Sequence, residues 1–234
     1  MLVETYDADV DAETLMAYCY ALLGTRSYVR RFEEELRTPG PRVPFPRDVA
    51  VLQRTAALGR RLLWLHTFGA RCGPSARFLS GAARCVVPPG DRLPTDFAYD
   101  PTRRTLRVGK GEFGPITPEV WDYSVSGMRI VSSWLRRRIS RTARGNSPLD
   151  NWGPSVWTAA PTRELVEVIW VLEATLALEP ELDAVLDEVV SGGGDALAGI
   201  RRGEQLLDVE RLQRPREDKA LTLVAAEPLE HRPL

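Results

Sequence analysis

The sequence predicts an α+β protein in which helical N- and C-terminal parts surround a small antiparallel sheet. Apolar residues recur every three or four positions in residues 11–63 and again in residues 128–190, which is typical of amphipathic helices. Between these parts, residues 73–117 carry short apolar runs separated by Gly, Pro and Ser, which favours strands joined by turns. The chain has 234 residues, of which 44% are hydrophobic and 27% are charged, so it is long enough to bury a core.

The N-terminal part is predicted to contain three helices. Asp11 can cap the first helix and Gly24 can end it, and a second short helix is expected in residues 27–36. Asp48 can cap the third helix, in which apolar residues recur at steps of three and four. These residues are Val49, Leu52, Ala56, Gly59 and Leu63.

Four prolines lie between the second and third helices, in the segment RTPGPRVPFPRD, residues 37–48. Each proline fixes its own φ angle and pushes the preceding residue towards extended backbone, so this proline strap is predicted to be rigid and extended. Val43 and Phe45 alternate with arginines, which predicts that one side of the strap lies on the core.

The central sheet is predicted in DFAYDPTRRTLRVGKGEFGPIT, residues 96–117, with turns at Asp100-Pro101 and at Gly109 to Gly111. The GKGEFG run has the spacing of a nucleotide-binding loop, but Pro115 follows at once and no helix opens there. We therefore interpret this run as a turn. Thr117 and Pro118 then form either a turn or the start of a helix.

The C-terminal part is predicted to start with a basic amphipathic helix, MRIVSSWLRRRISRTAR, in residues 128–144. After a loop rich in Gly, Pro and Asn, an acidic pair of helices broken before Pro180 is expected in residues 162–190. Residues 192–234 are predicted to form a Gly-rich linker and a loosely ordered tail. The folded domain is therefore expected to cover residues 1–191.

The formal net charge of −1 conceals two blocks that contain arginines and no acid, residues 49–90 and residues 123–149. Two such blocks in a nearly neutral chain suggest a surface that binds a polyanion. The second block includes the basic helix, where Arg137, Arg141 and Arg144 would share one face. The arginines considered as binding residues are Arg54, Arg60, Arg61, Arg129, Arg136, Arg137, Arg138, Arg141 and Arg144.

No complete catalytic constellation is present in the sequence. The two histidines are His66 and His231, and there is neither a G-x-S-x-G elbow nor a P-loop. His66 is interpreted as a hydrogen-bonded core residue, and Cys19, Cys72 and Cys85 as buried or free thiols, because their spacing does not suit a metal. We expect no catalytic residue, no cofactor and no metal. An acidic N-terminus and the absence of a long apolar run predict a cytoplasmic protein.

Four stretches of the sequence resemble, in order, the C-terminal specificity region of type ISP restriction-modification enzymes and related adenine-specific DNA methyltransferases. They are YCYALLGTRSYVRRFEEELRTPGPRVPFP, LGRRLLWLHTFG, WDYSVSGMRIVSSWLRRR and NSPLDNWGPSVW. The resemblance extends from about residue 12 to about residue 191. It implies a target-recognition domain that holds duplex DNA for an adjoining methyltransferase, with Arg136, Arg137, Arg138 and Arg141 on the basic helix of the family.

This resemblance leads to two hypotheses. In the first, the chain is a duplex-DNA-binding specificity domain or subunit whose partner is a methyltransferase or another restriction-modification protein. Asn146, Ser147 and Asn151 are then candidates to contact bases, because Asn can pair bidentately with adenine, although the same residues are also ordinary turn formers. In the second, the recognition fold is degenerate, makes no DNA contact and docks on a protein partner through its C-terminal helices. The sequence lacks the methyltransferase, nuclease and helicase motifs, so this chain alone is not expected to methylate or cleave DNA.

Overall fold

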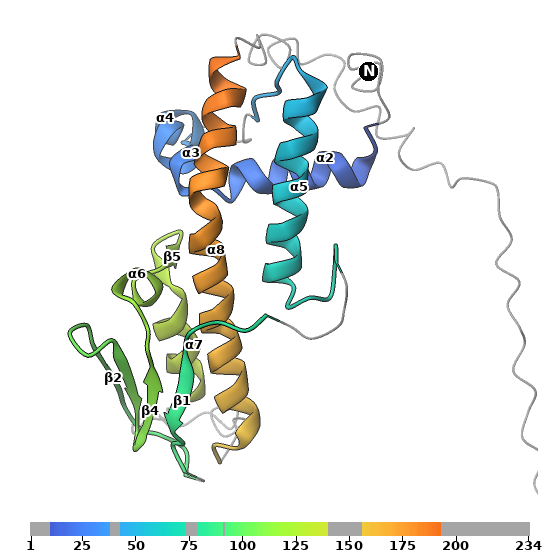
Figure 1. The fold of residues 1–234 in the computed structure, drawn as a ribbon. Helices are drawn as coiled ribbons and strands as arrows, with labels where there is room; N and C mark the ends of the chain where they lie inside the picture. The colour runs from blue at the N-terminus through green and yellow to red at the C-terminus, as the bar shows by residue number, and fades with distance from the viewer. Residues whose placement is uncertain (1–9, 38–42, 74–78, 91, 140–155, 193–234) are drawn as a thin grey trace, which may run out of the picture. The chain divides into compact units, whose positions relative to one another are not determined.

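The computed structural model describes residues 10–37, 43–73, 79–90, 92–139 and 156–192. All of them belong to one compact unit within Met1–Leu197. They form an N-terminal helical part, a small sheet and one long helix that contacts both (Figure 1). These observations confirm the predicted α+β class. Within the described ranges, no helix combines the length and the apolar character needed to cross a membrane.

The helical part contains four helices, α2 (Ala12–Leu23), α3 (Arg26–Arg31), α4 (Glu33–Leu36) and α5 (Val49–His66). The predicted caps are confirmed, because the Asp11 carboxylate accepts a hydrogen bond from the Thr14 N–H at 2.7 Å and Asp48 accepts one from the Ala50 N–H at 2.8 Å. The prediction of a single helix in residues 27–36 is wrong. Phe32 leaves the helical region at φ −113° and ψ 28°, where its ring packs on Tyr28, and this separates α3 from α4.

Helices α2 and α5 cross at a very short distance. A Cβ atom at Gly59 would lie 1.8 Å from the Ala17 carbonyl oxygen, so the glycine is what allows the two backbones to meet. The described part of the proline strap packs on the same pair of helices. The Phe45 ring stacks on Tyr18 with centroids 5.2 Å apart, and the Tyr18 hydroxyl donates to the Pro44 carbonyl. The segment that contains Pro39 and Pro41 lies outside the described residues.

The sheet has four antiparallel strands, β1 (Arg84–Val87), β2 (Phe97–Asp100), β3 (Thr105–Val108) and β4 (Gly111–Gly114), in the order β1-β4-β3-β2. The predicted turns are confirmed. Asp100 accepts hydrogen bonds from two backbone N–H groups of the β2–β3 turn, and Gly109 has a φ of 56° between β3 and β4. The GKGEFG run is therefore a hairpin turn and strand β4, as interpreted from the sequence.

Helix α8 (Ala159–Ser191) is one continuous helix of 33 residues, so the prediction of two helices broken before Pro180 is wrong. Pro180 removes one backbone hydrogen bond and disturbs the turn before it, at a cost of about 3 kcal/mol. This cost is offset because apolar residues are buried on both sides of the proline. Leu165 and Ile169 pack against the sheet, Leu178 and Leu182 against α2 and α5, and Leu186 and Val189 extend the helical core.

Candidate nucleic-acid interface

The candidate interface consists of a short helix, a hairpin and the basic helix, which follow one another in the chain. They are α6 (Pro118–Trp121), β5 (Ser124–Val125), β6 (Met128–Arg129) and α7 (Ile130–Arg138). Thr117 caps α6 through its hydroxyl, with Pro118 in the first turn, so the helix-start interpretation is correct. The basic helix begins at Ile130 rather than at the predicted residue 128, because Met128 and Arg129 pair with β5.

Aromatic residues anchor this segment to the sheet and to the helical part. The Trp121 ring stacks on Tyr99 of β2, with centroids 4.8 Å apart and planes 17° apart. The Tyr99 hydroxyl donates to the Ile116 carbonyl at 2.8 Å. Tyr123 is buried, and the guanidinium of Arg26 on α3 lies 4.9 Å from the centre of its ring. These contacts fix both ends of α6 and hold the start of the hairpin.

The inner side of α7 packs on the core and on the first turns of α8. Val131, Ser132 and Leu135 are buried. The Trp134 ring meets Trp157 edge to face at 6.2 Å, and the Arg138 guanidinium lies 3.9 Å from the centre of the Trp134 ring. Arg138 also forms an ion pair with Glu164 of α8 at 3.1 Å. Arg138 therefore contributes to the packing of α7 as well as to its charge.

The outer side of α7 presents arginines to solvent. Arg136 and Arg137 lie in the last turn of α7, and Arg129 precedes the helix as its N-cap residue in strand β6. Arg129 forms an ion pair with Asp122 at 3.3 Å and is 57% exposed. Arg136 and Arg137 are exposed, and no carboxylate in the described part of the chain pairs with either of them. This face is therefore positively charged.

Helix α7 ends at Arg138, because Ile139 is extended with φ −77° and ψ 154°. The prediction that one helix continues to residue 144 is therefore wrong at Ile139, and a shared helical face for Arg137, Arg141 and Arg144 is not formed by α7. The proposed contacts Arg141, Arg144, Asn146, Ser147 and Asn151 lie outside the described residues.

The arginines of α5 have a different environment. Arg54 forms an ion pair with Glu188 of α8 at 2.6 Å, and the hydrogen bond that its guanidinium donates to the Glu188 carboxylate raises the pKa of Arg54. Arg61 lies 3.9 Å from Glu181 of α8. Arg60 donates to the Thr14 hydroxyl at 2.6 Å and lies 3.8 Å from Glu13 of α2. All three arginines predicted in this block therefore face carboxylates that are distant in the sequence.

The two groups of arginines lie at different positions along α8. Arg138 pairs with Glu164, whereas Arg61 and Arg54 pair with Glu181 and Glu188. At 1.5 Å per residue, these partners are separated by about 26 to 36 Å along the helix axis. The sequence suggested that the two arginine blocks form one surface that binds a polyanion. In the structure, the arginines of α5 and those of α7 form two separate groups.

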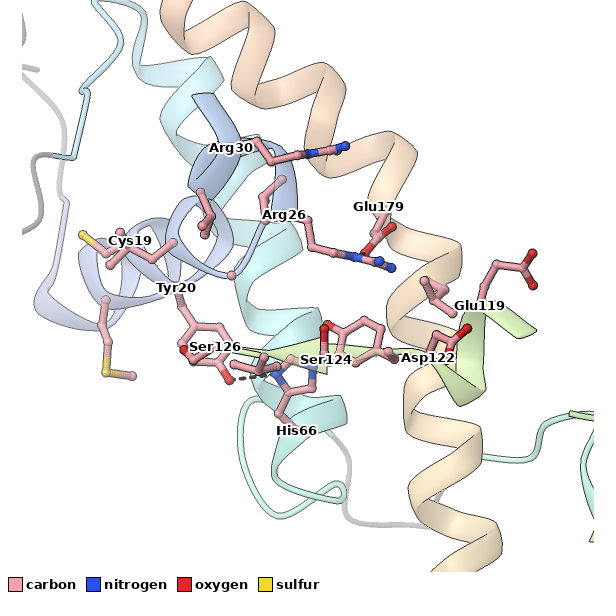
Figure 2. A pocket seen from close by; sticks show the side chains of 18 residues that line it. Cys19, Tyr20, Arg26, Arg30, His66, Glu119, Asp122, Ser124, Ser126 and Glu179 are labelled. Atoms are coloured by element: carbon pink, nitrogen blue, oxygen red, sulfur yellow. Dashed lines mark hydrogen bonds and ion pairs between the residues drawn. The ribbon is translucent and has the colours of Figure 1, made fainter. Parts of the chain in front are cut away.

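A cleft of about 1250 Å³ lies between α2, α3, α8 and the β5–β6 hairpin (Figure 2). His66, at the end of α5, lines it. The prediction that His66 is a core residue is wrong, because the residue is exposed at the wall of the cleft, but the predicted hydrogen bonding is present. Its Nδ1 lies 2.8 Å from the Tyr20 hydroxyl and its Nε2 lies 3.1 Å from the Thr175 hydroxyl.

The hydrogen bonds of Thr175 determine which nitrogen of His66 carries the proton. The Thr175 hydroxyl donates to the Val171 carbonyl at 2.8 Å, so it accepts from the Nε2–H group of His66. Nδ1 then accepts from Tyr20. Desolvation lowers the pKa of the His66 imidazole, which favours this neutral form.

The three cysteines are free, half-buried thiols, and burial raises the pKa of Cys19 and Cys85.

Sequence reasoning missed the β5–β6 hairpin as a separate element. Its six residues, Ser124 to Arg129, are all exposed, and the chain turns at Ser126 and Gly127. The Ser-Gly pair was a usable signal, because this dipeptide is common in turns. It was overlooked because the apolar period of the following helix extends back to Met128.

The fold and the sequence together define a specificity domain. The model of the Type ISP C-terminal specificity domain matches residues 2–168, so the chain belongs to this family. No curated protein matches the chain. Solved structures with the same fold include a nuclease-deletion mutant of the Type ISP restriction-modification enzyme LlaGI in complex with a DNA substrate mimic, the ATP-dependent Type ISP restriction-modification enzyme LlaBIII bound to DNA, and a DrdV–DNA complex.

These structural similarities are remote in sequence. For LlaGI, LlaBIII and DrdV respectively, the identities are 16%, 16% and 17%, and the TM-scores are 0.53, 0.57 and 0.53. They cover 73%, 77% and 76% of this chain but only 14%, 12% and 18% of the chains compared. The chain thus spans less than a fifth of the length of these proteins.

Proposed function

We propose that this chain binds duplex DNA as the target-recognition domain of a restriction-modification system that methylates adenine. The observation that carries the proposal is the outer face of α7, where Arg136 and Arg137 are exposed and have no carboxylate partner among the described residues, on a chain that belongs to a specificity-domain family. The DNA complexes of LlaGI, LlaBIII and DrdV support the same role.

In this proposal, the arginines of α7 neutralise phosphates and set the position of the duplex. Arg136 and Arg137 can approach a phosphate without first losing an ion pair. Arg129 and Arg138 each have a carboxylate partner, but exposed ion pairs contribute only about 0 to 1 kcal/mol, so phosphates can compete with these partners. Such contacts release counterions and provide affinity that does not depend on sequence.

We propose a structural role for the arginines of α5. Arg54 and Arg61 join α5 to α8, and Arg60 joins α5 to α2. Their positive charge is balanced by Glu188, Glu181 and Glu13. Contact between these arginines and DNA was a prediction from the sequence, and their pairing makes them weaker candidates than the arginines of α7.

Base recognition by Asn146, Ser147 and Asn151, and phosphate contact by Arg141 and Arg144, remain part of the proposal. They rest on the residue types and on the resemblance to the family, since these residues lie outside the described ranges. Methyl transfer is assigned to another polypeptide or to another part of the same one. We accordingly expect this chain to bind a methyltransferase or restriction-modification protein.

One argument for the alternative, a protein-interaction subunit without DNA contact, is not supported by the structure. It required the apolar and acidic C-terminal helices to be available for docking. Helix α8 instead buries its apolar residues against the sheet and against the N-terminal helices, and it pairs Glu164, Glu181 and Glu188 with arginines of the same chain. Exposed Met16, Leu23 and Val29 beside the cleft still favour a protein contact, which is compatible with a DNA-binding domain that docks on its partner.

The proposal is tested by titrating the full chain against fluorescently labelled duplex DNA at several salt concentrations and measuring anisotropy. Each phosphate contact contributes about −0.9 to the slope of log affinity against log salt, so contacts from two to four arginines of α7 predict a slope of about −2 to −4. Absence of binding at low salt, or affinity that does not change with salt, would contradict the proposal.

A further inference from the structure

We propose that the β5–β6 hairpin, Ser124 to Arg129, enters a groove of the duplex and contacts base edges. This inference rests on the proposed DNA-binding function. Phosphate contacts by α7 would not need the hairpin, whereas recognition of a base sequence needs an element that reaches the bases, and we assign that role to the hairpin. A two-stranded β-ribbon is narrow enough for the major groove of B-DNA. The hairpin precedes the basic helix directly, so the same stretch of chain supplies base contacts and phosphate contacts.

The backbone makes the hairpin tight and projecting. Ser124 pairs with Arg129 and Val125 pairs with Met128, which leaves only Ser126 and Gly127 in the turn. Their φ angles are 49° and 77°, and a turn with two such residues matches the natural twist of the strands. A Cβ atom at Gly127 would meet nothing within 4 Å, so this side of the tip faces open space, while Ser126 lines the cleft.

The base of the hairpin is fixed on both sides. Tyr123, which precedes β5, is buried, and its carbonyl accepts a hydrogen bond from the Ile130 N–H at 3.0 Å. Ile130 is the first residue of α7. The hairpin therefore projects from a rigid junction between α6 and α7, as a base-reading element requires.

The side chains of the hairpin are suited to bases rather than phosphates. Val125 is 52% exposed and Met128 is 46% exposed, although both are large and apolar. Apolar side chains can contact the methyl group of thymine, and serine hydroxyls such as those of Ser124 and Ser126 can donate to or accept from base edges. None of these four side chains can neutralise a phosphate.

Arginines lie across the cleft from the hairpin and on the adjoining helix α7. Strand β5 lines the cleft that Arg30 of α3 also lines (Figure 2). On the other strand, the Met128 sulfur lies 3.7 Å from a guanidinium nitrogen of Arg137. Of the three carboxylates that line the cleft, Asp122 and Glu179 are paired with Arg129 and Arg26 and are partly neutralised, whereas Glu119 of α6 has no ion-pair partner among the described residues. Uncharged side chains between the arginines of the cleft and those of α7 fit a groove with phosphates on each side.

The other two hairpins of the described chain differ from this one. The β2–β3 turn carries charged Arg103 and Arg104 and is closed by Asp100. At the β3–β4 turn, a Cβ atom at Gly109 would lie 3.1 Å from Pro94, so that turn is packed against the chain. Among these three turns, β5–β6 is the one whose tip residues, Ser126 and Gly127, are uncharged and exposed.

The test begins with selection of preferred sites from a randomised duplex pool by the full wild-type chain. Val125→Thr and Met128→Ala are then compared with the wild type on a selected duplex and on an unrelated duplex, with circular dichroism to check folding. Val86→Thr is the matched control, because Val86 is a strand valine that is 62% exposed, away from the hairpin.

If the hairpin contacts bases, each hairpin variant should lose about tenfold in affinity for the selected duplex and less than about twofold for the unrelated one. The slope of log affinity against log salt should not change, because no phosphate contact is lost. The control should behave like the wild type. Selection of no preferred sequence by a wild-type chain that binds DNA, or variants that keep the wild-type preference, would overturn the hairpin proposal. Failure of the wild-type chain to bind any duplex would instead overturn the proposed function.

Discussion

Helices α5 and α7 look alike in the sequence and differ in the structure. Each is apolar on one side, carries arginines on the other and lies in a block without acids. In the fold, Arg54, Arg60 and Arg61 of α5 are near carboxylates of α2 and α8, whereas Arg136 and Arg137 of α7 have no carboxylate partner in the described chain. An acid-free stretch therefore does not by itself identify a positively charged surface.

The difference arises from the long helix α8. Its second half carries Glu181 and Glu188, which pair with arginines of α5. Among the described residues of its first turns, Glu164 is the one carboxylate that pairs with α7, and its partner is Arg138. Changes around α5 are therefore expected to affect stability, and changes on the outer side of α7 are expected to affect DNA binding.

The largest effect is expected from Gly59→Ala on α5. The added methyl group would overlap the Ala17 carbonyl, so α2 and α5 must move apart and their shared core must repack. We expect a loss of at least about 2 kcal/mol in the free energy of unfolding, measured by urea denaturation. Gln53→Ala, an exposed change on the same helix, is the control and should have little effect. Equal stability of the two variants would show that the helices are not in close contact.

A smaller loss is expected from Phe45→Ala in the proline strap. The variant removes the ring that stacks on Tyr18, and because Phe45 is only half-buried the loss should be about 1 to 2 kcal/mol. Arg47→Ala, an exposed change nearby, should leave the thermal unfolding curve unchanged. If Phe45→Ala also left the curve unchanged, the strap would not contribute to stability.

The smallest effect concerns the pH dependence of stability at His66. Its pKa is lowered in the fold, so below pH 6.5 the unfolded chain binds more protons than the folded chain, and stability falls as the pH falls. The decrease in Tm from pH 7.5 to pH 5.5 should therefore be larger in the wild type than in His66→Gln, which cannot titrate. The same decrease in both proteins would contradict the assigned neutral form of His66.

Much of the fold could be predicted because local signals determined it. Asp11 and Asp48 are caps, Gly109 is a turn glycine, and the α+β class follows from the change in apolar period. The errors arose where tertiary contacts override local preference. Pro180 is a strong helix breaker, yet burial of Leu178 and Leu182 on either side keeps α8 continuous.

The site could be predicted only in part. The residue types and order of the basic helix indicated Arg136 and Arg137 correctly as exposed arginines. The ion pairs of Arg54 and Arg61 could not be predicted, because their partners lie 134 and 120 positions away in the chain. The hairpin was missed because Met128 fits the apolar period of a helix as well as it fits a strand.

The central claim, that α7 and not α5 binds DNA, is tested most directly by two matched double variants, Arg136→Gln with Arg137→Gln and Arg54→Gln with Arg61→Gln. Each removes two exposed positive charges from one helix, and duplex binding is measured by anisotropy across a range of salt concentrations. We predict that the α7 variant binds more weakly and that its log–log salt slope becomes shallower by about two units, whereas the α5 variant keeps the wild-type slope. Equal changes in both slopes, or a change in the α5 variant alone, would contradict the account.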